Sequence, residues 1–330
     1  MVRTLQAGSL QYTSHMAISF LIFIVIFLVA THFLIKELRR SPGSKEWGKT
    51  PRWRKRLRIV LACLPPLFFA FLIWGFFIEP NRLVIRPATI QIQNWPAELN
   101  GLRIAVISDI HTGGPFIDEK KLQLIVERTN KQRPDLVVLL GDFMSSNSWH
   151  SHFVAPEITA SVLKNFQAPL GTYAVLGNHD WWYDGNTVRR AFEAQGLTVL
   201  DNEVQDLRWK DKTFWLAGLA DYWTRPQRIE ATIAKARAGE PIIALTHNPD
   251  IFPRVPNSVP LLLAGHTHGG QVQIPFVGPL VASSDRSGRF YEGHYVENGH
   301  HLYITTGIGT SLFPMRFRVP PEIVILTITN

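Results

Sequence analysis

Short apolar runs alternate with amphipathic stretches along the chain beyond residue 80. The runs have the length of β-strands and are LRIAVIS (102–108), DLVVLLG (135–141), TYAVLG (172–177), FWLAGLA (214–220), PIIALTH (241–247), PLLLAG (260–265), LYITTG (302–307) and EIVILTI (322–328). The helices that the pattern predicts lie at Glu119–Lys131, Pro156–Asn165, Thr187–Gln195 and Pro226–Ala238. This alternation predicts an α/β architecture.

Two longer apolar runs precede this region. Residues 16–35 and 59–78 each form a stretch of 20 residues without a charged side chain, which is about the length that crosses the hydrocarbon layer of a bilayer. We therefore predict two transmembrane helices. A cleaved signal peptide is the alternative for the first run, but the run is long and no convincing cleavage site follows it. Pro65 and Pro66 leave a kinked span or a re-entrant hairpin open for the second run.

The predicted organisation follows from these two runs. The segments are an N-terminal tail (1–15), a transmembrane helix (16–35), a basic loop (36–58), a second transmembrane helix (59–78) and a long C-terminal domain (79–330). The loop contains ten Lys and Arg residues and two Glu residues. Short basic loops stay on the cytoplasmic side, so we expect a protein of a bacterial-type inner membrane whose long domain is extracytoplasmic. The cytoplasmic face is the alternative if one run does not span.

The formal net charge of +8 comes from the N-terminal end alone. Residues 1–86 contain 13 Lys and Arg against 3 Asp and Glu, whereas the remaining residues contain 21 against 23. A basic patch that could bind nucleic acid is therefore not expected in the long domain, and the basic end fits contact with anionic lipids. Cys63 is the only cysteine, which excludes a disulfide within the chain. The sequence does not identify a protein partner.

Five of the apolar runs end directly in residues that bind metals. These ends are SDIH (108–111), GDF (141–143), GNHD (177–180), THN (246–248) and GHTH (265–268). Ligands of open α/β sheets bind beyond the carboxyl ends of the strands, so we expect these side chains to converge. The candidate set consists of Asp109, His111, Asp142, Asn178, His179, His247, His266 and His268.

The chemistry of this set predicts a site for two divalent ions. Oxygen and imidazole ligands without a thiolate suit Mn, Fe, Co, Ni or Zn, and eight groups exceed what one ion binds. In an extended segment, residues i and i+2 point to the same side, so Asp109 with His111, and His266 with His268, can face one pocket. Each motif alone is weak evidence, but five in succession are not expected by chance.

The motifs D-x-H, G-D, G-N-H-D, a single H and G-H-T-H resemble the signature of the calcineurin-like metallophosphoesterases. The resemblance covers residues 82–330, and the segment TTGIGTSLFPMRFRVPPEIVILTI (305–328) is similar to a membrane-associated branch that includes UDP-2,3-diacylglucosamine hydrolases of lipid A synthesis. It implies a four-layer αββα sandwich of two mixed sheets. The strand and helix pattern alone does not distinguish this fold from a doubly wound sheet.

The resemblance also implies a role for each residue of the motifs. One metal would be bound by Asp109, His111, Asp142 and His268. The second would be bound by Asp142 as a bridge, with Asn178, His247 and His266. His179 would face the substrate phosphate without binding a metal, and Asp180 would orient it. Manganese is the favoured metal.

These roles predict a hydrolytic mechanism. Two divalent ions would neutralise charge on the phosphoryl oxygens and lower the pKa of a bridging water. His179, held by Asp180, would stabilise or protonate the departing oxygen. Weaker candidates for substrate contact are the aromatic residues Trp181, Trp182 and Tyr183, the histidines His150 and His152, and the arginines Arg316 and Arg318. For each of these, ordinary packing, a surface position or a structural ion pair is the competing explanation.

Three functions remain open at this point. The first is a membrane-anchored phosphoesterase that hydrolyses a phosphodiester or pyrophosphate bond in a lipid or nucleotide-lipid such as UDP-2,3-diacylglucosamine. The second is a broad-specificity phosphodiesterase or phosphatase for soluble substrates, and the third is an inactive membrane sensor or scaffold. The complete set of motifs disfavours the third. The cytoplasmic origin of UDP-2,3-diacylglucosamine conflicts with an extracytoplasmic domain.

Overall fold

The structure is a computed structural model of the 330-residue chain, and it describes residues 27–28, 31–32, 35–36, 51–145, 151–280, 289–311 and 313–330. The chain divides into two compact units, Met1–Trp74 and Gly75–Asn330. The first predicted transmembrane run, 16–35, lies almost entirely outside the described residues.

The second apolar run is helical. Helix α3 (Arg52–Ile73) continues through Pro65 and Pro66 without a break and is followed by a π-helical stretch, Trp74–Ile78. Within the described residues, Cys63–Asn81 is a helical stretch of 19 residues with a mean hydropathy of 1.6, enough in length and composition to cross a membrane. Length and composition are all that this finding rests on.

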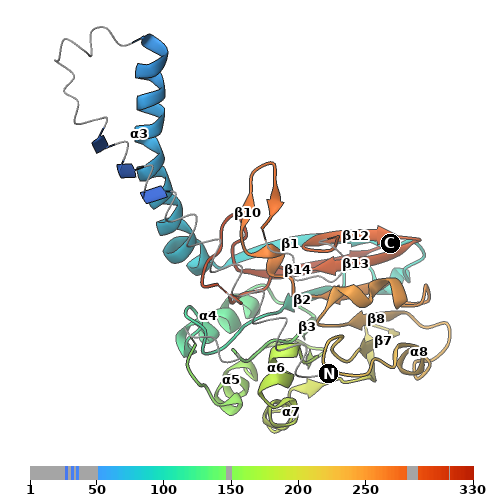
Figure 1. Cartoon of the computed structure of the whole chain (residues 1–330). Coiled ribbons are helices and arrows are strands. Elements are labelled where there is room, and N and C mark those ends of the chain that lie inside the picture. Colours follow the sequence, from blue (N-terminus) through green and yellow to red (C-terminus); the bar gives the residue numbers. More distant parts are fainter. Residues whose placement is uncertain are drawn as a thin grey trace. The chain divides into compact units, whose positions relative to one another are not determined.

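The second unit contains two mixed six-stranded sheets, shown in Figure 1. In spatial order, the first sheet consists of β1 (Val84–Gln91), β14 (Glu322–Thr329), β2 (Arg103–Ile107), β3 (Leu136–Leu139), β4 (Thr172–Ala174) and β5 (Thr198–Val199). Its strands are parallel apart from the antiparallel pairing of β14 with β2. The order β2-β3-β4-β5 follows the chain, as expected for successive crossover units.

The second sheet has the same mixed character. In spatial order it consists of β12 (Gly293–Glu297), β13 (His300–Ile304), β9 (Leu261–Ala264), β8 (Ile242–Leu245), β7 (Lys212–Gly218) and β6 (Glu203–Trp209). The two edge pairs, β12 with β13 and β7 with β6, are antiparallel, and the central strands are parallel. All eight strands predicted from the sequence are confirmed, and the prediction of a mixed α/β fold is confirmed with them.

Helices complete the unit. They are α4 (Glu119–Asn130), α5 (Pro156–Leu163), α6 (Asn178–Tyr183), α7 (Gly185–Glu193) and α8 (Ile229–Ile233), with 3₁₀ turns at Glu79–Asn81, Ala97–Leu99, Pro249–Arg254 and His268–Gly270. A small hairpin is formed by β10 (Gln273–Ile274) and β11 (Gly278–Pro279). The helices predicted near 119–131, 156–165 and 187–195 are confirmed. The one predicted at 226–238 is limited to α8, because 234–238 form turns.

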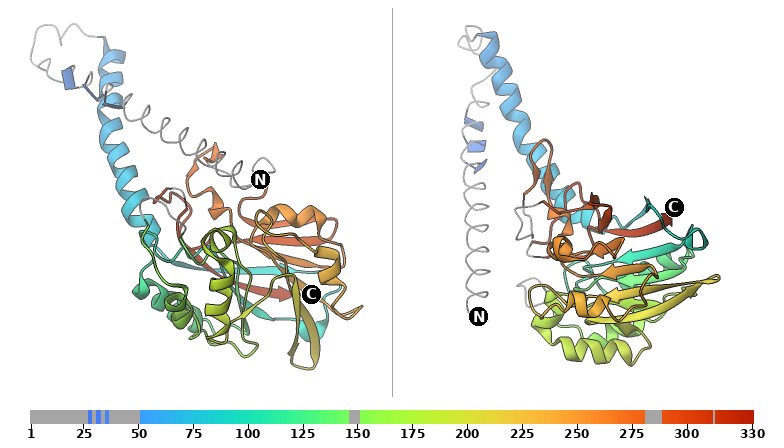
Figure 2. Two further views of the ribbon diagram at one scale, coloured as in Figure 1. Left: turned by 60° about the horizontal axis from the view of Figure 1, so that its bottom comes forward. Right: turned by 90° about the vertical axis from the view of Figure 1, so that its right-hand side faces the viewer.

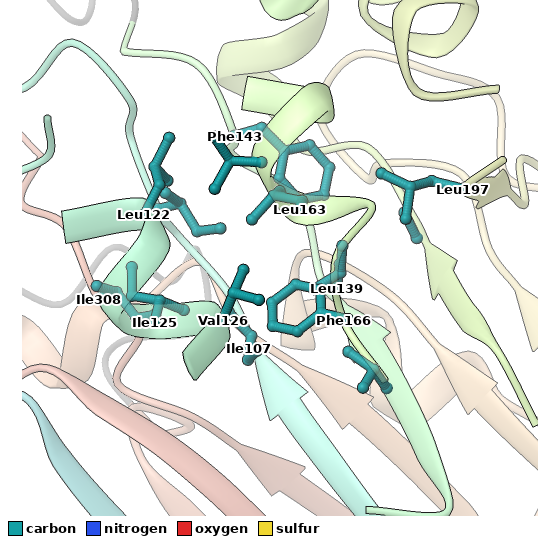
Figure 3. Close-up of a cluster of buried hydrophobic side chains, with 14 of the residues drawn as sticks. Ile107, Leu122, Ile125, Val126, Leu139, Phe143, Leu163, Phe166, Leu197 and Ile308 are labelled. Carbon is teal, nitrogen blue, oxygen red and sulfur yellow. The ribbon is translucent and has the colours of Figure 1, made fainter. Parts of the chain in front are cut away.

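The residues of each strand alternate between two apolar layers. In β2, Ile104 and Val106 belong to a core cluster that also contains Leu261 and Leu263 of the second sheet, so this cluster lies between the sheets. Ala105 and Ile107 point the other way, into a cluster with residues of α4, α5 and α7 (Figure 3). This is the period of two that a strand with two buried faces requires.

A third cluster covers the outer face of the second sheet. Leu262 and Ala264 of β9 pack there with Ile229 of α8 and with Ile251 and Phe252 of the 3₁₀ turn. The layers therefore follow one another as helix, sheet, sheet and helix, and Figure 2 shows the two sheets stacked. The parallel strands of both sheets end at one edge, where the sequence places the metal-binding residue types.

Candidate dinuclear metal centre

The ends of five strands bring their polar side chains together at this edge. Three groups of potential ligand atoms each lie within 4.8 Å of one another, and they are Asp109–His111–His268, His111–Asp142–His179 and Asp142–His247–His266. The three groups share members, and Asp142 belongs to two of them. All seven side chains are buried apart from His179, which is about 16% exposed.

Short distances join ligands that come from different sheets. The Nε2 atom of His247 lies 3.2 Å from Oδ2 of Asp142, and Nε2 of His268 lies 3.4 Å from Oδ1 of Asp109. The Nε2 atoms of His111 and His268 are 3.1 Å apart. The centre therefore lies between the two sheets, and it forms only when the two sheets are packed correctly against each other.

The backbone at the strand ends is locked by hydrogen bonds. The backbone N–H of Asp109 donates to the carbonyl of Gly141 (3.0 Å), and that of His111 donates to the carbonyl of Asp142 (2.9 Å). The N–H of His266 donates to both carboxylate oxygens of Asp109, at 3.2 and 3.0 Å. These bonds fix the directions of the ligands before any ion is bound, as a pre-organised site requires.

Five of the ligands have backbone conformations that L-residues rarely adopt. The φ angles are 53° for Asp109, 51° for His111, 54° for Asp142, 69° for His266 and 51° for His268. Such a left-handed conformation costs on the order of 1–3 kcal/mol at a residue other than glycine. Strain of this kind concentrated in one place marks a functional site.

Two glycines are required because the loops approach each other closely. A Cβ atom on Gly177 would collide with the carboxylate of Asp142, and one on Gly265 would collide with the side chain of Ser108. The first glycines of the G-N-H-D and G-H-T-H motifs therefore allow neighbouring strand ends to meet.

His247 illustrates how the site selects a ligand atom. Its Nδ1 lies 2.7 Å from the carbonyl oxygen of Leu140, which can only accept a hydrogen bond, so Nδ1 carries a proton and Nε2 faces Asp142. This arrangement fixes the tautomer that ligates through Nε2. Burial lowers the pKa of His247, but the charge of Asp142 outweighs it and raises the pKa to about 10. The pocket strongly favours a positive charge.

The remaining groups also fit cations. Burial opposes the ionisation of Asp142, but the imidazoles of His247 and His179 hold its pKa well below the usual range. Burial, followed by the charges of His111 and Arg316, keeps the pKa of His268 well below its ordinary value, so His268 is in the neutral form that binds metals. Among the described residues, the buried Oδ1 atom of Asn178 has no hydrogen-bond partner. A buried acceptor of this kind needs a ligand, and a divalent ion fits this donor set.

His179 lies at the mouth of the cluster. Its ring is 4.7 Å from the ring of His111, its Nε2 is 4.0 Å from Oδ2 of Asp142, and its backbone N–H donates to Oδ1 of Asp142 (2.8 Å). Burial lowers the pKa of His179 to about 4. The side chain is the most exposed of the group, as expected for a residue that contacts substrate.

The carboxylate of Asp180 ties two of the ligand loops together. Its carboxylate accepts hydrogen bonds from the backbone N–H groups of Phe143 (2.8 Å), Met144 (3.0 Å) and Gly177 (2.9 Å). Asp180 therefore joins the G-D loop to the G-N-H-D loop and does not orient the imidazole of His179 with these bonds. Burial raises the pKa of Asp180 to about 7. The hydrogen bonds that its carboxylate accepts favour the ionised form and oppose this rise.

The two arginines considered for substrate binding lie in different surroundings. Arg316 is fully buried, and its guanidinium donates to the carbonyls of Gly309, Val319 and Thr306 and lies 3.4 Å from Nδ1 of His268. These hydrogen bonds use the guanidinium within the protein and favour the structural explanation for this residue. Arg318 is exposed.

The two histidines considered for substrate contact are less informative. His150 lies outside the described residues, and His152 is exposed.

The aromatic residues after the G-N-H-D motif divide into inner and outer positions. Trp181 is partly buried and packs on the core and under the guanidinium of Arg225, at 4.4 Å. Trp182 is exposed, with its ring 4.9 Å from that of His179. Trp223 lies 6.4 Å from Trp182 and 4.4 Å from His266. Trp182 and Trp223 thus line the mouth of the centre.

Asp221 and Trp223, which lie near the centre, were not identified by the sequence analysis. Asp221 is buried, and its Oδ2 accepts hydrogen bonds from the backbone N–H groups of Trp223 (3.1 Å) and Thr224 (2.9 Å). Asp221 therefore positions Trp223. The sequence pattern that identified the other candidates also applies to Asp221, because it directly follows the apolar run 214–220 at the end of β7.

Comparison with known proteins agrees with this geometry. A model of the calcineurin-like phosphoesterase family matches residues 102–270. The metallophosphoesterase YkuE of Bacillus subtilis is 32% identical over 258 residues, which cover 77% of this chain and 88% of that protein. A transmembrane protein with metallophosphoesterase domain from Danio rerio is 29% identical over 92% of this chain and 69% of its own length. Phosphodiesterase YaeI of Escherichia coli is 29% identical, over 68% and 81% respectively.

Asp142 belongs to two of the three ligand groups, and this predicts how its substitution affects metal content. We expect Asp142→Asn to lose most bound metal and to lower activity by more than about 100-fold, because removal of an outer-sphere partner alone costs 10- to 100-fold. Elemental analysis of the purified protein, compared with Asp211→Asn in an exposed turn, measures this effect. Full metal content in Asp142→Asn would contradict the assignment.

Proposed function

The chain belongs to the calcineurin-like phosphoesterase family and is a metal-dependent phosphoric ester hydrolase, and on this premise we propose a dinuclear phosphodiesterase anchored in the membrane. Its substrate would contain a phosphodiester or pyrophosphate bond in a lipid or nucleotide-lipid, of which UDP-2,3-diacylglucosamine is one example. The observation that supports it most directly is the buried cluster in which Asp142 is shared between two groups of ligands.

We assign the metal ligands as the family resemblance implies. Asp109, His111, Asp142 and His268 would bind one ion, and Asp142, Asn178, His247 and His266 would bind the other. Two divalent ions, with manganese favoured, would supply Lewis acidity to the phosphoryl oxygens and activate water. The burial of the ligands and their locked backbones keep competing water and loop motion away from the reacting bond.

His179 would act on the substrate without binding a metal. Its position at the mouth, beside Trp182, places the imidazole where a leaving group departs from the cluster. Hydrogen-bond donation from this imidazole would stabilise charge on the leaving oxygen. Asp180, by joining the backbone of Gly177 to that of Phe143 in the neighbouring loop, would keep this position fixed.

A substrate at the membrane accounts for two further features. The apolar stretch Cys63–Asn81 runs into the start of the catalytic unit, and the exposed Trp182 offers an apolar contact beside the centre. Indole rings are favoured at membrane interfaces because they combine an apolar body with a polar N–H. Both features favour a lipid over a soluble phosphoester.

The proposed function predicts metal-dependent phosphodiesterase activity. Protein stripped with a chelator should be inactive and should recover on addition of Mn²⁺, because all nucleophile activation depends on the cluster. Hydrolysis of bis-p-nitrophenyl phosphate, a glycerophospholipid and UDP-2,3-diacylglucosamine should be compared, and we expect the highest kcat/KM for a lipid. A protein that retains full activity without metal, or prefers the soluble diester, would overturn the proposal.

The role of His179 leads to a second prediction. We expect His179→Ala to reduce kcat by about 10²- to 10⁴-fold on a diester with an alkoxide leaving group, with unchanged metal content. The loss should be smaller for p-nitrophenolate, which needs little stabilisation. His294→Ala, at an exposed position of β12, is the matched control. Equal losses for both leaving groups would exclude this role.

The basic loop predicts the side of the membrane. We expect alkaline phosphatase fused after Asn330 to be active and a fluorescent protein at the same position to be dark, since the loop of ten basic residues stays in the cytoplasm. The reverse result would place the catalytic unit in the cytoplasm, where UDP-2,3-diacylglucosamine is available.

A further inference from the structure

The β10–β11 hairpin carries several large apolar side chains that are exposed to solvent. Phe276 at its tip is completely exposed, and Val277 and Leu280 are 72% and 59% exposed. Residues 271–280 include no charged side chain. Figure 1 shows the hairpin projecting from the catalytic unit. A contiguous apolar patch of this kind on a folded surface marks an interaction site.

The conformation of the turn holds these side chains outward. The N–H of Val277 donates to the carbonyl of Ile274 (3.1 Å) and closes the turn, and Pro275 and Pro279 restrict the backbone on both sides. Phe276 has a φ of 67°. An aromatic residue in the left-handed region is unfavourable by itself, and water around its ring adds to the penalty. The turn thus leaves the ring of Phe276 fully exposed.

The base of the hairpin is tied to a neighbouring segment, 313–317. The side-chain amide of Gln271 donates to the carbonyls of Phe313 (2.9 Å) and Met315 (3.2 Å). The backbone N–H of Gln273 donates to the carbonyl of Phe317 (3.0 Å), and that of Phe317 donates to the carbonyl of Gln271 (2.8 Å). The hairpin and segment 313–317 thus form one connected piece of structure.

The same segment contacts the apolar stretch that enters the catalytic unit. The N–H of Arg316 donates to the carbonyl of Gly75 (2.9 Å), and the rings of Phe76 and Phe313 are 6.1 Å apart. Gly75 and Phe76 belong to the candidate span Cys63–Asn81. The hairpin is therefore connected, through segment 313–317, to Gly75 and Phe76 of this stretch.

We propose that the β10–β11 hairpin inserts Phe276, Val277 and Leu280 into the interfacial region of the lipid bilayer. The inference rests on the membrane anchoring proposed above. Lipid is favoured over a protein partner because the hairpin is continuous, through segment 313–317, with the end of the span. The exposed Arg318 next to Phe317 adds a positive charge suited to anionic head groups.

The consequence concerns the orientation of the catalytic centre. Gln271, at the base of the hairpin, lies three residues after the proposed ligand His268. A second membrane contact at this point would restrict the rotation that a single helical anchor permits. The metal centre would then be held at a fixed height and angle, where the phosphate of a lipid lies.

A depth measurement tests the insertion. The full-length protein with Cys63→Ser and Phe276→Cys would carry an environment-sensitive nitrobenzoxadiazole (NBD) label in vesicles of phosphatidylethanolamine and phosphatidylglycerol. Lys210→Cys in the same background is the control, because Lys210 is an exposed residue of the β6–β7 turn. We expect a blue-shifted emission at position 276 that is quenched by lipids with a shallow spin label, and neither effect at position 210.

Each outcome decides the proposal. Emission at position 276 that matches position 210 would overturn insertion, and a blue shift without quenching by spin-labelled lipid would show contact with protein instead of lipid. Val277→Cys provides a second probe position and should behave as Phe276→Cys does. The measurement is independent of catalysis, and flotation of the unlabelled protein with vesicles reports the anchor separately, so failure of the proposed function is distinguishable from failure of this inference.

Discussion

The carboxylates of Asp109 and Asp142 are buried together at the ends of two adjacent strands, and much of the surrounding structure compensates for that burial. A buried carboxylate without a cation or hydrogen-bond donors is highly unfavourable. Here donors come from the backbone of His266 and His179, and positive charge comes from His247, whose pKa rises to about 10. Two divalent ions would replace the proton on His247 and supply this compensation themselves, so that metal binding and the stability of the strand ends would be coupled.

The left-handed backbone of five ligands adds to this coupling. At roughly 1–3 kcal/mol for each residue, the total is comparable to the net stability of a typical domain. The strain is maintained because the strand ends are hydrogen-bonded to each other and the two sheets are fixed by the apolar layer between them. A core of this kind serves catalysis indirectly, since it prevents the ligand loops from relaxing.

Sequence reasoning predicted the central strands and the ligand cluster because both follow from local patterns. Strands such as β3 and β9 are buried on both faces and appear as uninterrupted apolar runs. Strands β1, β6 and β12 lie at sheet edges, where half-exposed faces and residues such as Pro87 weaken the pattern. The role of Arg316 could not be predicted, because its carbonyl partners come from loops that meet only in the folded unit.

Arg316 links the proposed metal ligand His268 to the segment around Gly75. Its backbone contacts Gly75 and its side chain lies against His268, so the segment that adjoins the apolar stretch is part of the support of a proposed metal ligand. Two cations held by carboxylates and imidazoles would activate water against the phosphorus of any phosphoester, and such a cluster would discriminate poorly between alcohols. Selection of the substrate must therefore come from the groups around the cluster. Trp182 and Trp223 at its mouth, together with the apolar hairpin that follows His268, are the features through which this chain would favour a phosphate presented at a lipid surface.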